Sequence, residues 1–302
     1  MVAHRTLGTL LYIMGEVAQT REHFAQSIAL YDPQQHRALA FAYGQDPGVA
    51  ALAVDAFALW TLGYPDQALQ RSHEACTRAE DLAHPFTLAY TFGLLAVFQQ
   101  FRRDREEAYR HAEAATRISR EQGFPLWLGV GLILQGWACV TRLQPAEQIA
   151  AMHEGMAIYR ATDAALFLPH FLTLLAETYG VANQPDAGLR FLDEARTVMD
   201  STQERYYEAE VHRVQGTLVL AQAADQHALA ETCFQHALAI ARRQQARSWE
   251  LRAAMSLARL WQQQGKQAEA HALLAPVYGW FTEGFDTADL QETRALLDAL
   301  GE

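Results

Sequence analysis

Cysteine is scarce in this chain of 302 residues, and its scarcity excludes two kinds of stabilising framework. The three cysteines, Cys76, Cys139 and Cys233, lie far apart and form no C-x-x-C pair. Disulfide-stapled domains and structural zinc sites need closely spaced and usually paired cysteines. The sequence therefore predicts a reducing compartment and no structural metal site. Because the first residues also lack the pattern of a secretory leader, we expect a cytoplasmic location.

Positive charge is also in short supply. Lys and Arg number 24 against 35 Asp and Glu, the formal net charge is -11, and Lys266 is the sole lysine. The field of such a chain repels phosphate backbones and anionic lipid headgroups. We therefore expect neither nucleic acid nor a membrane among its partners.

Long apolar segments are missing as well. The most apolar stretch, Phe124–Val140, contains Gln135 and has a proline as its second residue. It is shorter than the roughly 20 apolar residues that a membrane span needs. We therefore expect a helix that is buried on nearly all sides within the protein.

What the chain does contain is an internal repeat. Half of the residues are hydrophobic and only 9 are proline, so the chain can bury a core and is not disordered. A shift of 40 residues aligns small residues, and shorter columns at the same period begin at Ala68 and Ala75. The longest column of aligned small residues consists of Ala56, Ala96, Gly136, Ala176 and Gly216. After Gly216 the repeat frame slips by two residues.

Each repeat has the pattern of two amphipathic helices joined by a short break. In the second repeat, Val49–Leu62 and Gln67–Ala79 have helical spacing and the residues between them form a turn signal. Small residues allow two helices to approach closely, and proline suits the first turn of a helix. No stretch alternates for long enough to predict a strand. The prolines expected at helix starts are Pro65, Pro85, Pro125, Pro145 and Pro185.

These patterns resemble the tetratricopeptide repeat family. The first repeat has Leu7-Gly8, Gly15 and Phe24 at the family's spacing, and the last two repeats fit it better, with Gly216, Ala230-x-x-x-Phe234-x-x-Ala237 and Trp261-x-x-x-Gly265 followed by Ala270. The family's period is about 34 residues, so this chain is similar to a longer-helix variety. The resemblance implies a single all-α domain, a right-handed α-solenoid of about seven helix pairs with a C-terminal capping helix. The expected repeats lie near 1–48, 49–88, 89–128, 129–168, 169–208, 209–250 and 251–285, and the cap at 286–302.

A narrower resemblance lies in whole phrases of the sequence. Leu59–Leu69 and Ser256–Leu300 are similar to the C-terminal repeat region of large bacterial signalling proteins that join a class III nucleotide cyclase to an AAA-type ATPase. None of the catalytic parts of those proteins is present. The resemblance therefore implies a sensing or docking region for signal transduction, without cyclase or ATPase activity.

The motifs of catalysis and cofactor binding are missing. Gln267 follows Lys266 where a phosphate-binding loop needs Ser or Thr, and no G-x-S-x-G motif occurs. His73-Glu74 and His153-Glu154 each lack the second histidine that would share a metal one turn later. We therefore expect no enzyme activity, no cofactor and no metal ion.

A repeat array of this kind presents its first helices along a concave groove that suits a segment of another protein. We therefore expect a noncatalytic protein–protein interaction or regulatory scaffold; the alternative is a sensor domain that encloses a small molecule or peptide. Aromatic side chains of the groove would anchor an apolar part of the partner and arginines an acidic part. The aromatic side chains alternatively pack on one another as ordinary core. The expected groove residues are Phe57, Trp60, Tyr90, Val97, Ile133, Trp137, His170, Glu177, Glu210, Arg213, Arg252, Arg259 and Gln262.

The two ends of the array differ in the sequence. Asp286–Leu300 has the pattern of a single helix that an Asp or Thr side chain caps and that covers the last pair through its leucines. The first residues enter a repeat almost at once, which suggests that a preceding domain or another copy of the chain covers this face. We therefore expect self-association through residues 1–31. Asp32–Gly48 exceeds the repeat and forms either a packing excursion or a contact loop.

Overall fold

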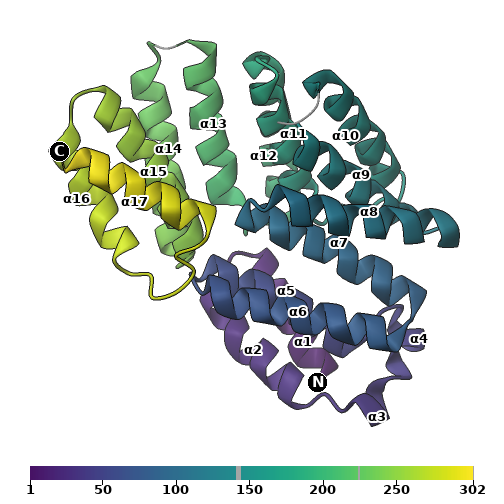
Figure 1. Ribbon diagram of the computed structural model, residues 1–302. Coiled ribbons are helices and arrows are strands. Elements are labelled where there is room, and N and C mark those ends of the chain that lie inside the picture. The colour runs from purple at the N-terminus through teal and green to yellow at the C-terminus, as the bar shows by residue number, and fades with distance from the viewer. Residues whose placement is uncertain (141–143, 224, 302) are drawn as a thin grey trace. The chain divides into compact units, whose positions relative to one another are not determined.

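The computed structural model describes residues 1–140, 144–223 and 225–301. These residues form seventeen α-helices and no strand, so the all-α fold class is confirmed (Figure 1). The chain divides into two compact units. The first contains residues 1–59 and 67–166, and the second contains residues 60–66 together with those from Phe167 onward.

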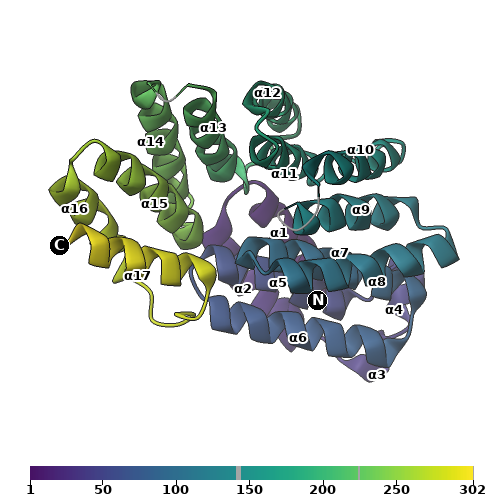
Figure 2. The same ribbon diagram turned by 45° about the horizontal axis from the view of Figure 1, so that its top comes forward.

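Helices of the first compact unit pack in the order of the sequence. α1 lies against α2, α7 against α8, α8 against α9 and α9 against α10, and Figure 2 shows the helices from α7 to α10. α7 also contacts α9, so the first helices of successive pairs touch, which is the packing of an α-solenoid. The unit contains α1 (Val2–Ile13), α2 (Val17–Ala29), α3 (Pro33–His36), α4 (Leu39–Tyr43), most of α5 (Pro47–Thr61) and of α6 (Pro65–Leu82), α7 (Pro85–Arg102), α8 (Arg105–Gln122), α9 (Pro125–Cys139) and α10 (Pro145–Arg160).

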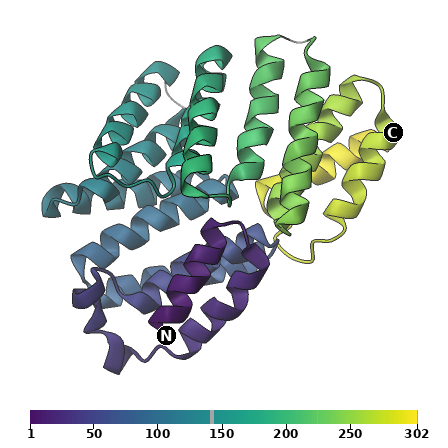
Figure 3. The ribbon, with the colours of Figure 1, turned by 180° about the vertical axis from the view of Figure 1, so that it is seen from behind.

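The second compact unit repeats this arrangement. Each helix from α11 to α17 contacts the next one, and α11, α13, α15 and α17 also contact one another in turn. Figure 3 shows the green helices α13 and α14 of this unit side by side. The helices are α11 (Leu168–Val181), α12 (Pro185–Thr202), α13 (Glu208–Gln222), α14 (His227–Arg243), α15 (Arg247–Gln263), α16 (Gln267–Tyr278) and α17 (Ala288–Leu300).

Proline marks the helix starts that the sequence predicted. α6, α7, α9, α10 and α12 each begin at a proline, where the missing amide hydrogen costs no helical hydrogen bond. Gly63, in the turn before α6, has a φ of 93°, and a Cβ there would lie 2.5 Å from the ring of Trp280. Both the backbone angle and the crowding favour glycine at this turn.

Small residues of the 40-residue column lie where helices approach closely. Ala56, Ala96 and Ala176 have no exposed surface. A Cβ on Gly136 would lie 2.9 Å from the carbonyl oxygen of Gln148 on the paired helix, and one on Gly216 would lie 2.6 Å from the ring of Phe234. The predicted role of the column in helix packing is therefore confirmed, while the number of repeats and their handedness stay predictions.

The most apolar stretch forms α9, most of whose residues are buried, as the sequence predicted. Its Gly129 and Gly155 of α10 face each other, because a Cβ on either would lie 2.8 Å from the carbonyl oxygen of the other. Within the described part of the chain, no helix combines the length and the apolar character needed to cross a membrane.

The two chain ends differ in how they are covered. α17 packs on α15 and α16 and buries Leu290, Leu296 and Leu300, as expected of a capping helix. Its N-cap residue, Thr287, makes no capping bond; its hydroxyl donates to the Gly284 carbonyl at 2.7 Å instead, so the expected side-chain cap is wrong. Among the exposed large apolar side chains are Leu7 and Leu10 of α1 and Met14, the residue that follows it.

Asp32–Gly48 contains α3 and α4 and packs against its unit, which favours the expected packing excursion. Ala40 is buried, and Asp46 is buried as well, receiving the backbone N–H groups of Gly48 and Val49 at 2.9 Å each. Phe41, by contrast, is 81% exposed. The segment thus packs against its unit and still presents an aromatic side chain to solvent.

Candidate functional site

Most predicted groove residues of the first compact unit lie in its core. Phe57, Val97, Ile133 and Trp137 are at most 3% exposed. The Phe57 ring lies 6.1 Å from that of Tyr12 and 5.2 Å, edge to face, from that of Phe101. This burial favours the alternative in which the aromatic side chains pack on one another as core.

Tyr90 and Trp137 are held by specific partners. The half-buried Tyr90 ring meets that of Trp127 edge to face at 5.1 Å, and burial raises the pKa of its hydroxyl to about 12. The Arg105 guanidinium lies 4.2 Å from the centre of the Trp137 ring and also donates to the Trp137 carbonyl. A cation over an indole face is attracted by the ring's quadrupole. These contacts stabilise the unit internally.

In the second compact unit, Arg252 on α15 lies at the centre of a buried polar network. Its Nε donates to Asp289 Oδ2 at 2.8 Å, and its Nη1 lies 3.4 Å from Glu210 Oε2. Its guanidinium also sits over the rings of Trp60 and Trp249, at 5.0 and 5.1 Å. Only 6% of Arg252 is exposed. A buried guanidinium group is tolerated only when acceptors such as these carboxylates receive its N–H donors.

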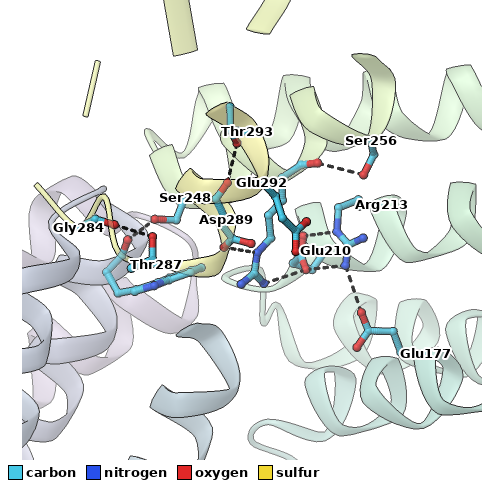
Figure 4. Close-up of polar contacts among 12 residues, drawn as sticks. Glu177, Glu210, Arg213, Ser248, Ser256, Gly284, Thr287, Asp289, Glu292 and Thr293 are labelled. Atoms are coloured by element: carbon cyan, nitrogen blue, oxygen red, sulfur yellow. Dashed lines mark hydrogen bonds and ion pairs between the residues drawn. The ribbon is translucent and has the colours of Figure 1, made fainter. Parts of the chain in front are cut away.

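Glu210 connects this arginine to a second one. Arg213 Nε donates to Glu210 Oε1 at 2.7 Å, and Arg213 Nη2 donates to Glu177 Oε1 at 3.3 Å; Figure 4 shows these three side chains converging. Burial alone would raise the pKa of Glu210, but Arg213 and Arg252 hold it below its ordinary value. Glu210 is therefore ionised at neutral pH, and the network joins α11, α13, α15 and α17.

All three predicted arginines pair with carboxylates of the chain itself. Arg213 and Arg252 belong to the network just described, and Arg259 donates to Glu292 at 2.8 Å on the surface. An acidic segment of a partner would have to displace these carboxylates. The arginines therefore contribute first to holding the helices of this unit together.

His170 is a core histidine. It has no exposed surface, and the Tyr206 hydroxyl lies 3.0 Å from its Nδ1. The ring of Tyr207 lies 4.0 Å from the imidazole. Burial lowers the pKa of His170 to about 3, so the ring is neutral at physiological pH.

Glu177 and Arg213 do line a surface cavity. This cavity, which we call the α11–α13 cavity, has a volume of about 280 Å³. Its lining is mostly apolar, and Val181 at its edge is 50% exposed. The lining residues are Glu177, Gly180, Val181, Arg213, Val214, Thr217, Leu218 and Ala221. Two predicted groove residues therefore stand at a hollow that is open to a ligand.

Sequence reasoning missed several members of these sites. Asp289 and Trp249 were not among the expected residues, although a spacing signal existed for part of the network. Arg213 follows Glu177 by 36 residues and Arg252 follows Glu210 by 42, and both separations are close to one repeat. Residues one repeat apart lie on neighbouring first helices, so opposite charges at that spacing indicate an ion pair.

Among the described residues, no group of three or more His, Cys, Asp and Glu side chains is arranged to hold a metal ion. No protein-family model matches this chain. It is 26% identical over 209 residues to an uncharacterized protein of Rhizobium meliloti (strain 1021). The match covers 68% of this chain and 20% of that relative, so the chain spans about a fifth of the relative's length.

Proposed function

We propose that this protein is a noncatalytic interaction and regulatory module that binds a segment of another protein. The observation that carries the proposal is the α11–α13 cavity. It lies between two first helices of the repeat array, where repeat proteins bind extended or helical segments. Its volume of about 280 Å³ suits a single large side chain of a partner.

The chemistry of the cavity favours an apolar anchor beside a polar group. Val214 and Leu218 form its apolar lining, and burying a large aliphatic or aromatic side chain there contributes roughly 1.5–3 kcal/mol. Glu177 is about a third exposed, with its side chain 36% accessible. A charged edge around an apolar centre is the usual arrangement of a protein–protein interface. The partner segment therefore carries an apolar side chain and a polar neighbour that reaches Glu177 and Arg213.

The setting that we propose is a bacterial signalling protein. The support for it is the likeness of Leu59–Leu69 and Ser256–Leu300 to the repeat regions of cyclase and ATPase signalling proteins. In the Rhizobium meliloti relative, the matching region is a fifth of a much longer chain. A docking region that recruits or senses a partner for such a protein fits both observations.

Selection from a library of displayed peptides tests the proposal without knowledge of the partner. We expect enriched peptides with one shared apolar residue, and we expect Ala221→Trp, which fills the cavity, to abolish their binding. Ala157→Trp, at an exposed helical position of α10, is the matched control and leaves binding unchanged. Peptides that bind both variants equally, or no enrichment at all, would refute the assignment of the cavity.

A second candidate function, that of a small-ligand sensor, is favoured by a different observation. The first compact unit contains a polar cavity with a buried carboxylate in its lining. Such a cavity does not suit the apolar anchor of a protein partner.

A further inference from the structure

The polar cavity of the first compact unit lies among α2, α5 and α6 and has a volume of about 260 Å³. Drug-sized ligands occupy pockets of roughly 300–1,000 Å³, so this one suits a smaller metabolite. Its lining contains two arginines, two glutamines and one aspartate beside a small apolar part. The residues are Arg21, Ala25, Asp55, Leu59, Gln67, Gln70 and Arg71.

Asp55 is the unusual member of this lining. It is 4% exposed and stands in the otherwise apolar run of α5. Arg71 Nε donates to its Oδ2 at 3.1 Å, whereas no described residue donates to its Oδ1. Desolvation raises the pKa of Asp55 to about 6 against the opposing effect of Arg71 and Arg21. The carboxylate is therefore ionised at neutral pH but incompletely compensated, and a further donor at Oδ1 would stabilise it.

The rim of the cavity offers the opposite charge. Arg71 is partly exposed, and its Nη1 donates to Glu74 Oε2 at 2.9 Å, which leaves its Nη2 without an acceptor among the described residues. Arg21 on α2 lies across from it and donates to Gln67 Oε1 at 3.4 Å. Gln70 is exposed at the same rim. A ligand at this rim meets guanidinium and amide donors.

We propose that this cavity binds a free α-amino acid. Its ammonium group donates to Asp55 Oδ1, its carboxylate accepts from Arg71, and its side chain lies on Leu59 and Ala25. The positive ammonium group of such a ligand thus faces the negative Asp55, and its negative carboxylate faces the positive Arg71. A plain anion would meet the Asp55 carboxylate, and a plain cation would meet the guanidinium groups, so only a zwitterion is complementary to both.

The proposal goes beyond the interaction module and does not rest on it. The α11–α13 cavity belongs to the other compact unit, and its occupant is apolar. Loss of peptide binding there leaves the amino-acid site intact, and the reverse also holds.

Calorimetric titration of the full chain with single ligands tests the proposal. L-Alanine, L-leucine and L-glutamine are compared with two analogues that each lack one charge, propionate and ethylamine. We expect saturable binding of at least one amino acid, and binding of either analogue at least about tenfold more weakly, because each loses a charge-assisted hydrogen bond. Failure of all three amino acids to bind, or an analogue that binds as tightly as the amino acids, would overturn the proposal.

Variants then assign the binding to this cavity. Asp55→Asn and Arg71→Gln keep the size of each side chain and remove its charge, and each is expected to weaken binding at least about tenfold. The matched controls are Asp193→Asn and Arg117→Gln, which change exposed side chains on α12 and α8 and leave binding unchanged. Binding unaffected in both cavity variants places the ligand elsewhere and refutes the site. If Asp55→Asn does not fold, Arg71→Gln and the analogue series decide.

Discussion

One register position of the 40-residue period carries mainly apolar side chains in the first compact unit and polar or charged ones in the second. Tyr90 and Val130 occupy it in the first unit, and His170, Glu210 and Arg252 occupy it in the second, the last after the two-residue slip. Val130 is 2% exposed, Glu210 2% and Arg252 6%. These three residues are buried although their chemistry is opposite, and Tyr90 is half-buried.

The difference shows two ways to bury the same face of a first helix. Apolar side chains gain free energy in proportion to the area that leaves water, in any orientation that packs. Buried charges lose their hydration free energy, and only partners at fixed distances compensate for this loss. Asp289 is such a partner for Arg252, and Arg213 is one for Glu210. At this position the second unit therefore relies on directional contacts and the first on packing.

Removing the central guanidinium is the strongest way to break this comparison. Arg252→Met keeps roughly the length of the side chain but removes the guanidinium that pairs with Asp289 and one of the two arginines beside Glu210. Breaking a buried ion pair by removing one member costs about 3–5 kcal/mol, and we expect a loss of that size in chemical denaturation. Arg259→Met, at the exposed pair with Glu292, should cost no more than about 1 kcal/mol.

A second change separates loss of pairing from loss of packing. Adding Asp289→Asn to Arg252→Met removes the buried carboxylate charge that has lost its arginine, so part of the stability should return. A double variant as unstable as the sum of its single variants would show that the network contributes through shape alone.

Overpacking the small-residue column should affect both units alike. Gly136→Leu and Gly216→Leu force a side chain into Gln148 and Phe234 respectively, and each should destabilise the protein by about 1–3 kcal/mol in thermal unfolding. Ala157→Leu, at an exposed helical position, is the control and should leave the melting temperature nearly unchanged. Unchanged stability in both glycine variants would contradict the close approach of the paired helices.

The helices were predictable because their signals are local. Pro85 and Pro125 fix the first turn of a helix whatever surrounds them, and glycine or alanine at a fixed period is needed wherever two helices touch. The side-chain cap at Thr287 was not predictable in this way. Its hydroxyl had a competing acceptor, the Gly284 carbonyl, that only the folded turn brings within reach.

The candidate sites were predictable only in part. The period placed Glu177 and Arg213 on first helices, and both line the α11–α13 cavity. It could not distinguish an aromatic side chain that faces a groove from one, such as Phe57, that meets Phe101 in the core. That distinction depends on how closely successive repeats pack, which a sequence period does not specify.

Glu204 in the second unit sharpens the comparison of buried carboxylates. It is 2% exposed, its Oε2 receives the Phe167 backbone N–H at 3.1 Å, and its Oε1 has no hydrogen-bond partner. Burial raises its pKa to about 8, well above that of Asp55 with its arginine. Since the folded-state pKa is raised, its favourable contribution is complete below about pH 4.5 and is lost as the pH rises towards 8.

Glu204→Gln should therefore stabilise the protein at neutral pH. The amide retains an acceptor for Phe167 and carries no charge, so we expect a gain of about 1–2 kcal/mol at pH 7.5 that falls to near zero at about pH 4. Denaturant unfolding at the two pH values measures this difference. Glu121→Gln, an exposed site, should show no such dependence, and an equal gain at both pH values would exclude ionisation as the cause.

The smallest effect on stability is expected at the N-terminal helix, where self-association is the relevant quantity. Leu7 and Leu10 of α1 and Met14 just after it are 44%, 54% and 55% exposed, whereas Leu290, Leu296 and Leu300 of α17 are buried. Residues three and four apart share a helix face, so this stripe is an apolar surface available to a second copy of the chain. Leu10→Lys should change stability by less than about 0.5 kcal/mol, since the side chain is exposed already, but should shift sedimentation at high concentration towards the monomer. Leu229→Lys, which alters a similarly exposed leucine on α14, should leave the association unchanged. A wild-type chain that sediments as a monomer at all concentrations would show that this apolar stripe does not mediate self-association.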